Sequence, residues 1–572
     1  MRFLLLFLVP LTLQAQSLRF EAVELPTDAA GHGIAVADGT GDGIDDLFIA
    51  AFNGTSVFLR GDGAGGFVDV TAEAGLSVSG NAAAPAWADV DNDGHPDLYV
   101  GIRGGSSPNK LFRNRGDGTF EDVLEAAGLD AEVRVGAVTW GDFDADGRVD
   151  LFVGTRDAPD QLYRNVSTPG DIRFEDLSGR GGTKGSVTSI AMQATWFDAD
   201  HDGDLDLFAV HDSQVPNRFY RNEGFLPMRD IARGIGVDVV AAGNAMGVAW
   251  SDVDGDGWED VYVSRIGTAS LYRNLGDGTF ELTPDAAGAA QNGMSWGSVF
   301  ADLDNDLDED LFVVSSSGFD RTPMLLYEHE AGRFTETGQS AGVRVQREAY
   351  GAASLDANQD GLPDLVLADE DGQSMLFLNR TETTGTWAKL RLTGSETNRM
   401  AIGTRVEATV GSRTLLRTVG GGDSYCAQSS QTLHLGLGDA TQIDALAIYW
   451  ADGRTERYEN LGAGTVHTIV EGSGLVTTNV ETAPEAMTLG LAMFPNPARG
   501  GVNASLRIGD PSTVRLEVYD LLGRRVLTPV TQRLPAGTHD LRVDVSALPA
   551  GLYIARAVTP NAERTIRFAV AE

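Results

Sequence analysis

The stretch WADVDNDGHPDLYV, residues 87–100, places carboxylates at alternate positions and then returns to apolar residues. Asp89, Asp91, Asp93 and Asp97 bring four negative charges into nine residues. Because like charges held a few ångströms apart repel each other, a folded loop of this composition is stable only when something neutralises it. The stretch therefore predicts a bound cation.

The same pattern recurs along the chain. Small residues precede each acidic run, with a Trp or Phe among them in five of the seven, and a short apolar segment such as DLYVGI or DLFVGT follows it. The runs start at intervals of 50 to 56 residues, and a fixed period of about 50 is typical of a propeller or a solenoid. The runs begin at Asp38, Asp89, Asp142, Asp198, Asp252, Asp302 and Asp356.

Each repeat contains four short strand-like segments with turn residues between them, which is the content of one propeller blade. Fourth-strand phrases occur near residues 67, 120, 174, 225, 280 and 334, and one more, FEAV at 20, precedes the first acidic run. We expect this N-terminal strand to complete the last blade and so close the ring, which removes two sheet edges. The predicted fold is all-β: a seven-bladed, integrin-α-like β-propeller followed by two small β-sandwich domains.

Counted from its first Asp, each acidic run offers side-chain oxygens at positions 1, 3, 5 and 9 and a backbone carbonyl at position 7, with glycine at position 6 in six of the seven runs. Calcium takes six to eight oxygen ligands in flexible geometry, and glycine permits the sharp turn that such a loop needs. We therefore expect up to seven Ca²⁺ ions. The candidate ligands are Asp38, Thr40, Asp42, Ile44 and Asp46; Asp89, Asp91, Asp93, His95 and Asp97; Asp142, Asp144, Asp146, Arg148 and Asp150; Asp198, Asp200, Asp202, Asp204 and Asp206; Asp252, Asp254, Asp256, Trp258 and Asp260; Asp302, Asp304, Asp306, Asp308 and Asp310; and Asp356, Asn358, Asp360, Leu362 and Asp364.

Two other interpretations of the acidic runs were weighed. An EF-hand needs a Glu at position 12 and flanking helices, whereas position 12 is apolar in every run, so that interpretation fails. Seven solvated acidic turns without ions remain the alternative. The loops should also differ, because Thr40 and Asn358 each remove one charge and Leu307 replaces the glycine, so we expect weaker binding in the first, sixth and last loops.

The composition limits the classes of partner and the compartment. A formal net charge of −39 argues against binding to nucleic acid or to anionic membranes. Residues 1–15 read as a secretory signal peptide, with a membrane anchor as the alternative, and no later segment is long enough to span a bilayer. Cys426 is the single cysteine, so no intrachain disulfide can form, and we expect it to be a small buried residue.

The repeats resemble FG-GAP (VCBS-type) repeats of integrin-α-like propellers over residues 16–384. The phrases NRMAIGTRV, QTLHLGLG and IYWADGRTERYENL resemble the ASPIC/UnbV domain of the cartilage acidic protein family, here at 385–472. After a linker at 473–487, LAMFPNPARGG and LPAGLYIARAV resemble a type A C-terminal sorting domain of the type IX secretion system at 488–572. That resemblance implies contact with this secretion machinery and a secreted or surface-attached product. A permanent Ig-like adhesive module is the alternative.

No catalytic constellation stands apart from the repeats: no nucleophile elbow, zinc-ligand spacing or phosphate loop is found. The histidines His95 and His201 lie within acidic loops, where we expect their side chains to face solvent. The favoured hypothesis is a monomeric, calcium-binding, non-enzymatic scaffold that binds an extracellular protein or polysaccharide. The alternative is an enzyme that degrades extracellular polymers at a site in the propeller channel.

Overall fold

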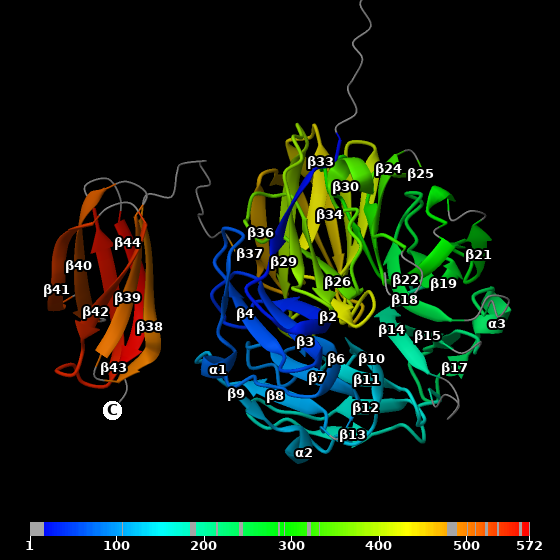
Figure 1. Ribbon diagram of the computed structural model, residues 1–572, viewed down its shortest axis with the longest axis horizontal. Coiled ribbons are helices and arrows are strands. Elements are labelled where there is room, and N and C mark those ends of the chain that lie inside the picture. Colours follow the sequence, from blue (N-terminus) through cyan, green and yellow to red (C-terminus); the bar gives the residue numbers. More distant parts are fainter. Residues whose placement is uncertain are drawn as a thin grey trace, which may run out of the picture. The chain divides into compact units, whose positions relative to one another are not determined.

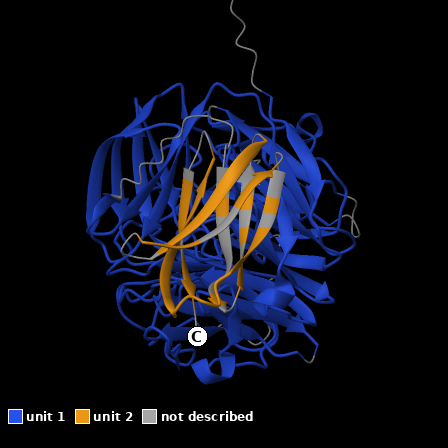
Figure 2. Ribbon diagram, turned by 90° about the vertical axis from the view of Figure 1, so that its left-hand side faces the viewer, with its two compact units in different colours: residues 1–478 blue, residues 479–572 orange. Residues whose placement is uncertain are grey.

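The computed structural model is all-β apart from one-turn helices, and its described residues form two compact units (Figure 1). The units are residues 1–478 and 479–572 (Figure 2). The expected signal peptide lies outside the described residues. The structure describes residues 17–105, 107–183, 190–212, 215–238, 244–283, 287–290, 292–316, 322–330, 332–476, 489–499, 501–508, 511–520, 524–534, 537–559 and 563–570.

Within these residues, strands β1 to β28 form seven antiparallel groups of four, called sheets 1 to 7 here in chain order. An additional pairing between β19 and β22 joins sheets 5 and 6. The strands are β2 (Ala30–Ala37), β3 (Asp46–Asn53), β4 (Val57–Gly61) and β5 (Phe67–Asp69); β6 (Asn81–Ala88), β7 (Asp97–Gly104), β8 (Lys110–Asn114) and β9 (Phe120–Asp122); β10 (Val135–Gly141), β11 (Asp150–Thr155), β12 (Gln161–Asn165) and β13 (Phe174–Asp176); β14 (Ala191–Phe197), β15 (Asp206–His211), β16 (Arg218–Arg221) and β17 (Arg229–Asp230); β18 (Ala245–Ser251), β19 (Asp260–Thr268), β20 (Ser270–Asn274) and β21 (Phe280–Thr283); β22 (Asn292–Ala301), β23 (Asp310–Ser315), β24 (Leu325–Glu330) and β25 (Arg333–Glu336); and β26 (Ala349–Leu355), β27 (Asp364–Asp369), β28 (Met375–Asn379) and β1 (Phe20–Glu24).

The sheets form a closed ring around a central axis (Figure 1). The first strand of each sheet contacts the first strand of the next, in the order β2, β6, β10, β14, β18, β22 and β26, and β26 contacts β2 again. Strand β1 pairs antiparallel with β28, with Phe20 opposite Asn379, so the N-terminal strand completes the last sheet as the sequence predicts. This pairing joins the two ends of the ring.

Every acidic run is the hairpin turn between the first and second strands of its sheet, as predicted. The first Asp of the run follows the last residue of the first strand, and the Asp at position 9 begins the second strand. In sheet 2, for example, Ala88 pairs with Asp97 across the loop. All seven loops therefore lie at the same end of the ring, which is called the loop face below.

Short helices follow the fourth strand in several sheets, and one fourth strand lies elsewhere than expected. In sheet 4 the strand is Arg229–Asp230, whereas the sequence predicts it near residue 225. Pro227, which has no backbone N–H to donate, lies between these positions. The helices are α1 (Thr71–Ala74), α2 (Leu124–Ala127), α3 (Ala232–Ile235) and α5 (Gly338–Ala341).

The segment after the ring forms two further four-stranded sheets within the same compact unit. Their apolar residues, Leu390 and Val406 among them, belong to one buried cluster with ring residues such as Trp140. The first sheet has the order β33 (Leu433–Gly438), β29 (Thr386–Thr393), β36 (Thr465–Val470), β37 (Gly474–Val476); the second has the order β31 (Arg413–Thr418), β30 (Arg405–Val410), β34 (Gln442–Tyr449), β35 (Thr455–Gly462).

These two sheets lie on the loop face of the ring. The Arg391 guanidinium donates to the carbonyl of Gly43 at 3.2 Å, and the Thr418 hydroxyl donates to Glu259 at 2.9 Å. In the last loop, next to the first in the closed ring, the Lys389 ammonium binds the Asp356 carboxylate. The acidic loops are therefore covered by protein on one side.

One segment of this covering domain, residues 419–430, enters the ring from the loop face. Because it bonds to the first strand of every sheet and these strands form a closed ring, the segment lies inside the ring. Within it, β32 (Ala427–Gln428) pairs in parallel with β2. The contacts are Cys426 O with Ile34 N, Gln428 with both backbone groups of Trp87, Gly421 O with Trp140 N, Cys426 N with Gln193, Ser424 N with Val248 O, Ser424 Oγ with Ser298 N, and Ser430 N with Ser354 O.

The second unit is a separate seven-stranded sandwich with its own buried cluster, which includes Leu516, Ala555 and Phe568. Among the described residues, no helix has the length and apolar character that crossing a bilayer requires. The strands, in sheet order, are β41 (Arg525–Leu534), β40 (Ser512–Asp520), β43 (Gly551–Val558), β44 (Glu563–Val570), β38 (Leu489–Arg499), β39 (Gly501–Ile508) and β42 (Gly537–Asp544).

A buried asparagine at the end of the third strand links neighbouring sheets of the ring. Asn165 donates from Nδ2 to the carbonyl of Val90 in the preceding loop at 2.8 Å and to that of Val149 in its own loop at 2.9 Å. Its Oδ1 accepts the amide of Ser167 at 2.8 Å. The same inter-sheet bond recurs at Asn114, Asn222, Asn274 and Asn379.

The substitution Asn165→Ala should destabilise the ring by about 2 to 4 kcal/mol, because it removes three hydrogen bonds and leaves buried carbonyls without donors. Denaturant unfolding of the two proteins measures this change. Asn53→Ala, at an exposed position, is the control and should shift stability by less than about 0.5 kcal/mol. Equal effects of the two substitutions would contradict the proposed link between sheets.

Candidate metal centre

Each acidic loop is shaped by two backbone positions in the left-handed region. Position 6 has φ between 85° and 96° in all seven loops, and position 4 has φ between 53° and 74°. Glycine at position 6 follows from this geometry, since other residues are strained there. The requirement at position 4 was missed from the sequence, because Asn92, Ala145, His201 and Gln359 are among the residues that fill it.

The Asp at position 1 is held by the loop's own amides. In the second loop, Asp89 Oδ1 accepts the N–H of Asp93 at 3.0 Å and Oδ2 accepts that of Gly94 at 2.7 Å. The equivalent pair of bonds occurs in the other six loops. This carboxylate is therefore fixed in one orientation before any ion binds.

The Asp at position 9 is buried and connects the start of the second strand to its own loop and to the third strand. Asp150 is fully buried, accepts the amide of Asn165 on Oδ1 at 2.7 Å and that of Phe143 on Oδ2 at 3.1 Å. Burial and the neighbouring carboxylates raise its pKa well above the ordinary value. Position 9 thus joins the loop to the third strand.

The structure brings the carboxylates of five loops together, with one oxygen from each of three residues within 4.8 Å of one another. The first and last loops have Thr40 and Asn358 at position 3 and so offer fewer carboxylates. The five groups are Asp89, Asp91 and Asp97; Asp142, Asp144 and Asp146; Asp198, Asp200 and Asp202; Asp252, Asp254 and Asp256; and Asp302, Asp304 and Asp306.

The oxygen at position 3 gives the sharpest test of whether a metal ion fits. Asp144 Oδ1, Asp200 Oδ1 and Asp304 Oδ1 are buried and accept no hydrogen bond, and the same holds for the hydroxyl of Thr40. A buried polar oxygen without a partner costs about 1 to 3 kcal/mol, and more when it is charged. Since the donor set is oxygen only, these orphaned atoms fit a hard cation such as Ca²⁺.

The same crowding changes the acidity of the ligands. Burial, with the adjacent Asp93 and Asp91 carboxylates, raises the pKa of Asp89 to about 7. Burial also raises the pKa values of Asp142 and Asp252 to about 7. In the absence of an ion, these groups therefore carry protons at a pH where an isolated aspartate does not.

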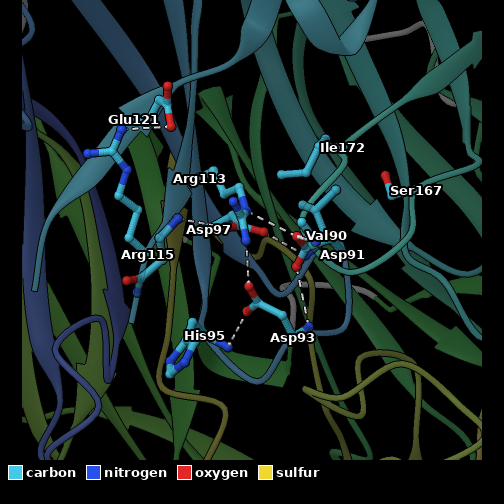
Figure 3. Close-up of polar contacts among 12 residues, drawn as sticks. Val90, Asp91, Asp93, His95, Asp97, Arg113, Arg115, Glu121, Ser167 and Ile172 are labelled. Carbon is cyan, nitrogen blue, oxygen red and sulfur yellow. Dashed lines mark hydrogen bonds and ion pairs between the residues drawn. The ribbon is translucent and has the colours of Figure 1, made fainter. Parts of the chain in front are cut away.

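An arginine from the third strand reaches into several loops, a feature missed from the sequence. Figure 3 shows Arg113 of β8 between Asp91 and Asp93, each 3.1 Å from a guanidinium nitrogen. The recurring Arg in KLFRN, QLYRN, RFYRN and SLYRN was the available signal. Arg164, Arg221 and Arg273 pair with their own loops in the same way.

Two loops depart from the pattern for visible reasons. Leu307 has φ 85°, a conformation that costs about 1 to 2 kcal/mol for a residue with a Cβ, so the sixth loop carries the strain that the sequence predicts. In the last loop, Lys389 of the covering domain binds Asp356 at position 1. This ammonium competes with a cation for the same carboxylate, which adds a second reason for weak binding there.

The expectation that the loop histidines face solvent is wrong for His201. Its ring stacks on Trp258 with centroids 4.1 Å apart, and Nε2 lies 3.1 Å from Glu259 Oε2. The side chain is 14% exposed. The ring of His95 is half-buried beside Gly116. Cys426 is buried as expected, and burial raises its pKa to about 11.

Three family models match the chain. The FG-GAP-like repeat matches residues 38–100, 101–153, 142–209, 198–263 and 252–313, and "ASPIC and UnbV" matches 394–476. "Secretion system C-terminal sorting domain" matches 492–571. The loop at Asp356 lies beyond the repeat match but has the same backbone geometry.

The chain is similar to curated proteins and to a solved structure. Human cartilage acidic protein 1 is 30% identical over 256 residues, which are 41% of this chain and 38% of the human protein. The Xenopus tropicalis protein of the same name is 31% identical over 205 residues, which are 34% of this chain and 31% of that protein. The matched part thus spans less than two fifths of either relative's length. A structure of an Agrocybe aegerita lectin, described as recognising non-reducing terminal N-acetylglucosamine, covers 61% of this chain and 94% of its own with 17% identity and a TM-score of 0.37.

The sorting domain marks the protein for secretion and cell-surface attachment through the type IX secretion system. The chain consists of FG-GAP-like repeats, an ASPIC and UnbV domain and a secretion sorting domain, and it is similar to cartilage acidic protein 1.

Proposed function

We propose that the ring is a seven-bladed, calcium-stabilised scaffold through which this secreted or cell-surface protein binds an extracellular protein or polysaccharide. The buried, unpartnered oxygens at position 3 carry the calcium part of this proposal. The adjoining carboxylates at positions 1 and 5, already oriented, complete an all-oxygen ligand set. Bound Ca²⁺ would remove the repulsion within each loop and let the hairpins close.

A non-enzymatic role is supported by the filling of the ring. Residues 419–430 bond to all seven first strands, so the space along the axis that a polymer-degrading site would use holds a protein segment instead. The buried Cys426 within it has a raised pKa, which disfavours a thiolate nucleophile. We therefore propose that the protein binds its ligand without converting it.

A glycan array probed with the secreted chain, with and without calcium, tests this role. Saturable, calcium-dependent binding without turnover of the bound polymer supports a scaffold. Release of shortened polymer would contradict it and favour the enzyme. The covered loop face leaves the opposite end and the outer strands of the ring as contact surfaces.

Calcium removal should lower the melting temperature of unit 1 by about 6 to 10 °C. At about 1 mM calcium, a site with a dissociation constant of about 0.1 mM contributes about 1.4 kcal/mol, so the four loops with the full ligand set contribute about 6 kcal/mol and seven such sites would contribute about 10 kcal/mol. With an unfolding entropy of about 2 cal/mol/K per residue, this corresponds to about 1 °C per kcal/mol for a unit of this size. Calorimetry in calcium and in EDTA measures the shift, and an unchanged melting temperature would contradict the proposal.

A single loop can be tested against a matched control. Asp144→Ala removes the side-chain ligand at position 3 of the third loop and should lower the number of bound ions by one in titration calorimetry. Asp117→Ala removes an exposed aspartate whose carboxylate accepts from Thr119 in an ordinary turn, and it should leave the number unchanged.

The stabilising effect of calcium should depend on pH. Because burial raises the folded-state pKa values of Asp89, Asp142 and Asp252 to about 7, the ion-free protein loses stability as pH rises from about 6 to 8. Calcium binds the ionised carboxylates, so its stabilising effect should be largest at pH 8 and decrease as pH falls to 6. Melting curves at both pH values, in calcium and in EDTA, measure this. An equal calcium shift at pH 6 and pH 8 would rule out competition with protons.

A further inference from the structure

The end of the ring opposite the loop face carries residues that differ from sheet to sheet. The residue fourteen positions after the first Asp of each run lies at or next to the end of the second strand, and these residues surround the axis. Unlike the loops, they share no residue type. They are Phe52, Arg103, Arg156, Asp212, Ile266, Ser316 and Glu370.

The inserted segment reaches this end of the ring. Its tip, Tyr425, lies among first-strand residues six positions before the loops: the ring of Tyr425 is 5.6 Å from that of His32 and 4.9 Å from that of Trp296. Cys426 Sγ lies 3.8 Å from the carbonyl oxygen of Gly136. The inserted segment thus brings Tyr425 of the covering domain to this end of the ring.

A hydrogen-bonded relay fixes one arginine here. Arg103 Nη1 donates to His32 Nε2 at 2.6 Å and also to the hydroxyl of Tyr425. Because arginine has no acceptor, His32 Nε2 accepts, and its Nδ1–H donates to Glu370. Burial and the nearby arginines hold the pKa of His32 well below its usual range, so the ring is neutral. It links Arg103 to Glu370 by hydrogen bonds, and the Glu370 carboxylate also compensates Arg103 electrostatically.

The neighbouring arginine is less directly compensated. Among the described residues, no carboxylate lies within ion-pair distance of Arg156, and its side-chain hydrogen bond is a weak one from Nη1 to the sulfur of Met192 at 3.8 Å. The aliphatic part of its side chain lies 3.4 Å from where a Cβ on Gly136 would be. Burial and the charge of Arg103 lower the pKa of Arg156, and the Asp212 carboxylate opposes this at longer range, so both charged groups lie within electrostatic reach of the Arg156 guanidinium.

We propose that His32, Arg103, Arg156, Glu370 and Tyr425, called the axial cluster, form a binding site for an oxyanion group of an extracellular ligand, with Arg156 as its direct contact. The site is a second one, at the opposite end of the ring from the calcium loops, and its ligand needs no calcium ion.

The chemistry favours an oxyanion over other ligand groups. A half-buried guanidinium beside another positive charge is destabilised, and a bidentate carboxylate, sulfate or phosphate group relieves this repulsion. A cation is disfavoured by the two arginines. At the same end of the ring, Phe52 in the sheet next to that of Arg103, and Ile266, two sheets from Arg156 and 38% exposed, offer apolar surface to the rest of such a ligand. A carboxylate of an acidic sugar and an inorganic oxyanion share this chemistry, so the test separates them.

Ligand-observed NMR titration of the calcium-loaded chain tests the site with four probes: D-glucuronate, inorganic phosphate, sulfate and, as the neutral control, D-glucose. At least one oxyanion should bind saturably below about 10 mM, whereas glucose should not. Arg156→Gln should weaken this binding about tenfold or more, because it removes a charge-assisted hydrogen bond. Arg156→Lys keeps the charge but not the paired N–H donors of the guanidinium, so it should weaken binding by an intermediate factor.

Arg115→Gln is the matched control, since Arg115 is an exposed arginine paired with Glu121 on an outer strand of the ring. It should bind as the unchanged chain does. Binding of glucuronate alone would identify a carboxylate ligand, and binding of phosphate or sulfate alone an inorganic or esterified one; either supports the site. No saturable binding of any oxyanion, or equal binding by Arg156→Gln, would overturn the proposal, while the calcium-dependent melting temperature reports separately on the scaffold.

Discussion

The mutual repulsion of carboxylates in the hairpin loops is the constraint on which the ring depends. Each loop fixes its first Asp with two backbone amides, and the last Asp accepts backbone amides as well, as at Asp142 and Asp150, so the negative charges converge because the fold requires these bonds. In four loops the backbone leaves an oxygen at position 3 buried without a partner. Strand pairing and charge neutralisation are therefore coupled, since the hairpin that builds each sheet also builds its cluster of oxygens.

Much of the ring and of its acidic loops could be predicted from the sequence, because the patterns that specify them are short and recur in every repeat. The period, the hairpins, the glycine at position 6 and the closing strand at Phe20 all follow from short patterns. The αL backbone at position 4 could not be predicted, since residues as different as Ala145 and His201 occupy it. The third-strand arginine that reaches the second to fifth loops was visible in KLFRN and its equivalents, but its direction depends on strand pairing, which composition does not reveal.

The insertion of residues 419–430 into the ring was beyond sequence reasoning for a different reason. Its partners, from Ile34 to Ser354, are spread over the whole repeat region, and no single one has a recognisable motif. The segment GGGDSYC reads as an ordinary loop, yet a Cβ on Gly421 would lie 1.9 Å from the carbonyl oxygen of Trp140, so its glycines permit close approach to the ring. A boundary between ring and sandwich drawn from composition therefore separates two parts that share one core.

The two ends of the ring thus obey different rules, and the difference bears on function. At the loop face, the same residue types recur in every sheet because each hairpin brings carboxylates together and must offset their repulsion. The covering domain then buries these loops on one side. At the other end, the equivalent position changes from Arg103 and Arg156 to Ile266 and Glu370, although the backbone around it repeats. A position whose side chain is not needed for stability can differ between sheets without cost to the fold. In a repeat protein, such variable positions are therefore the ones available for recognising a ligand.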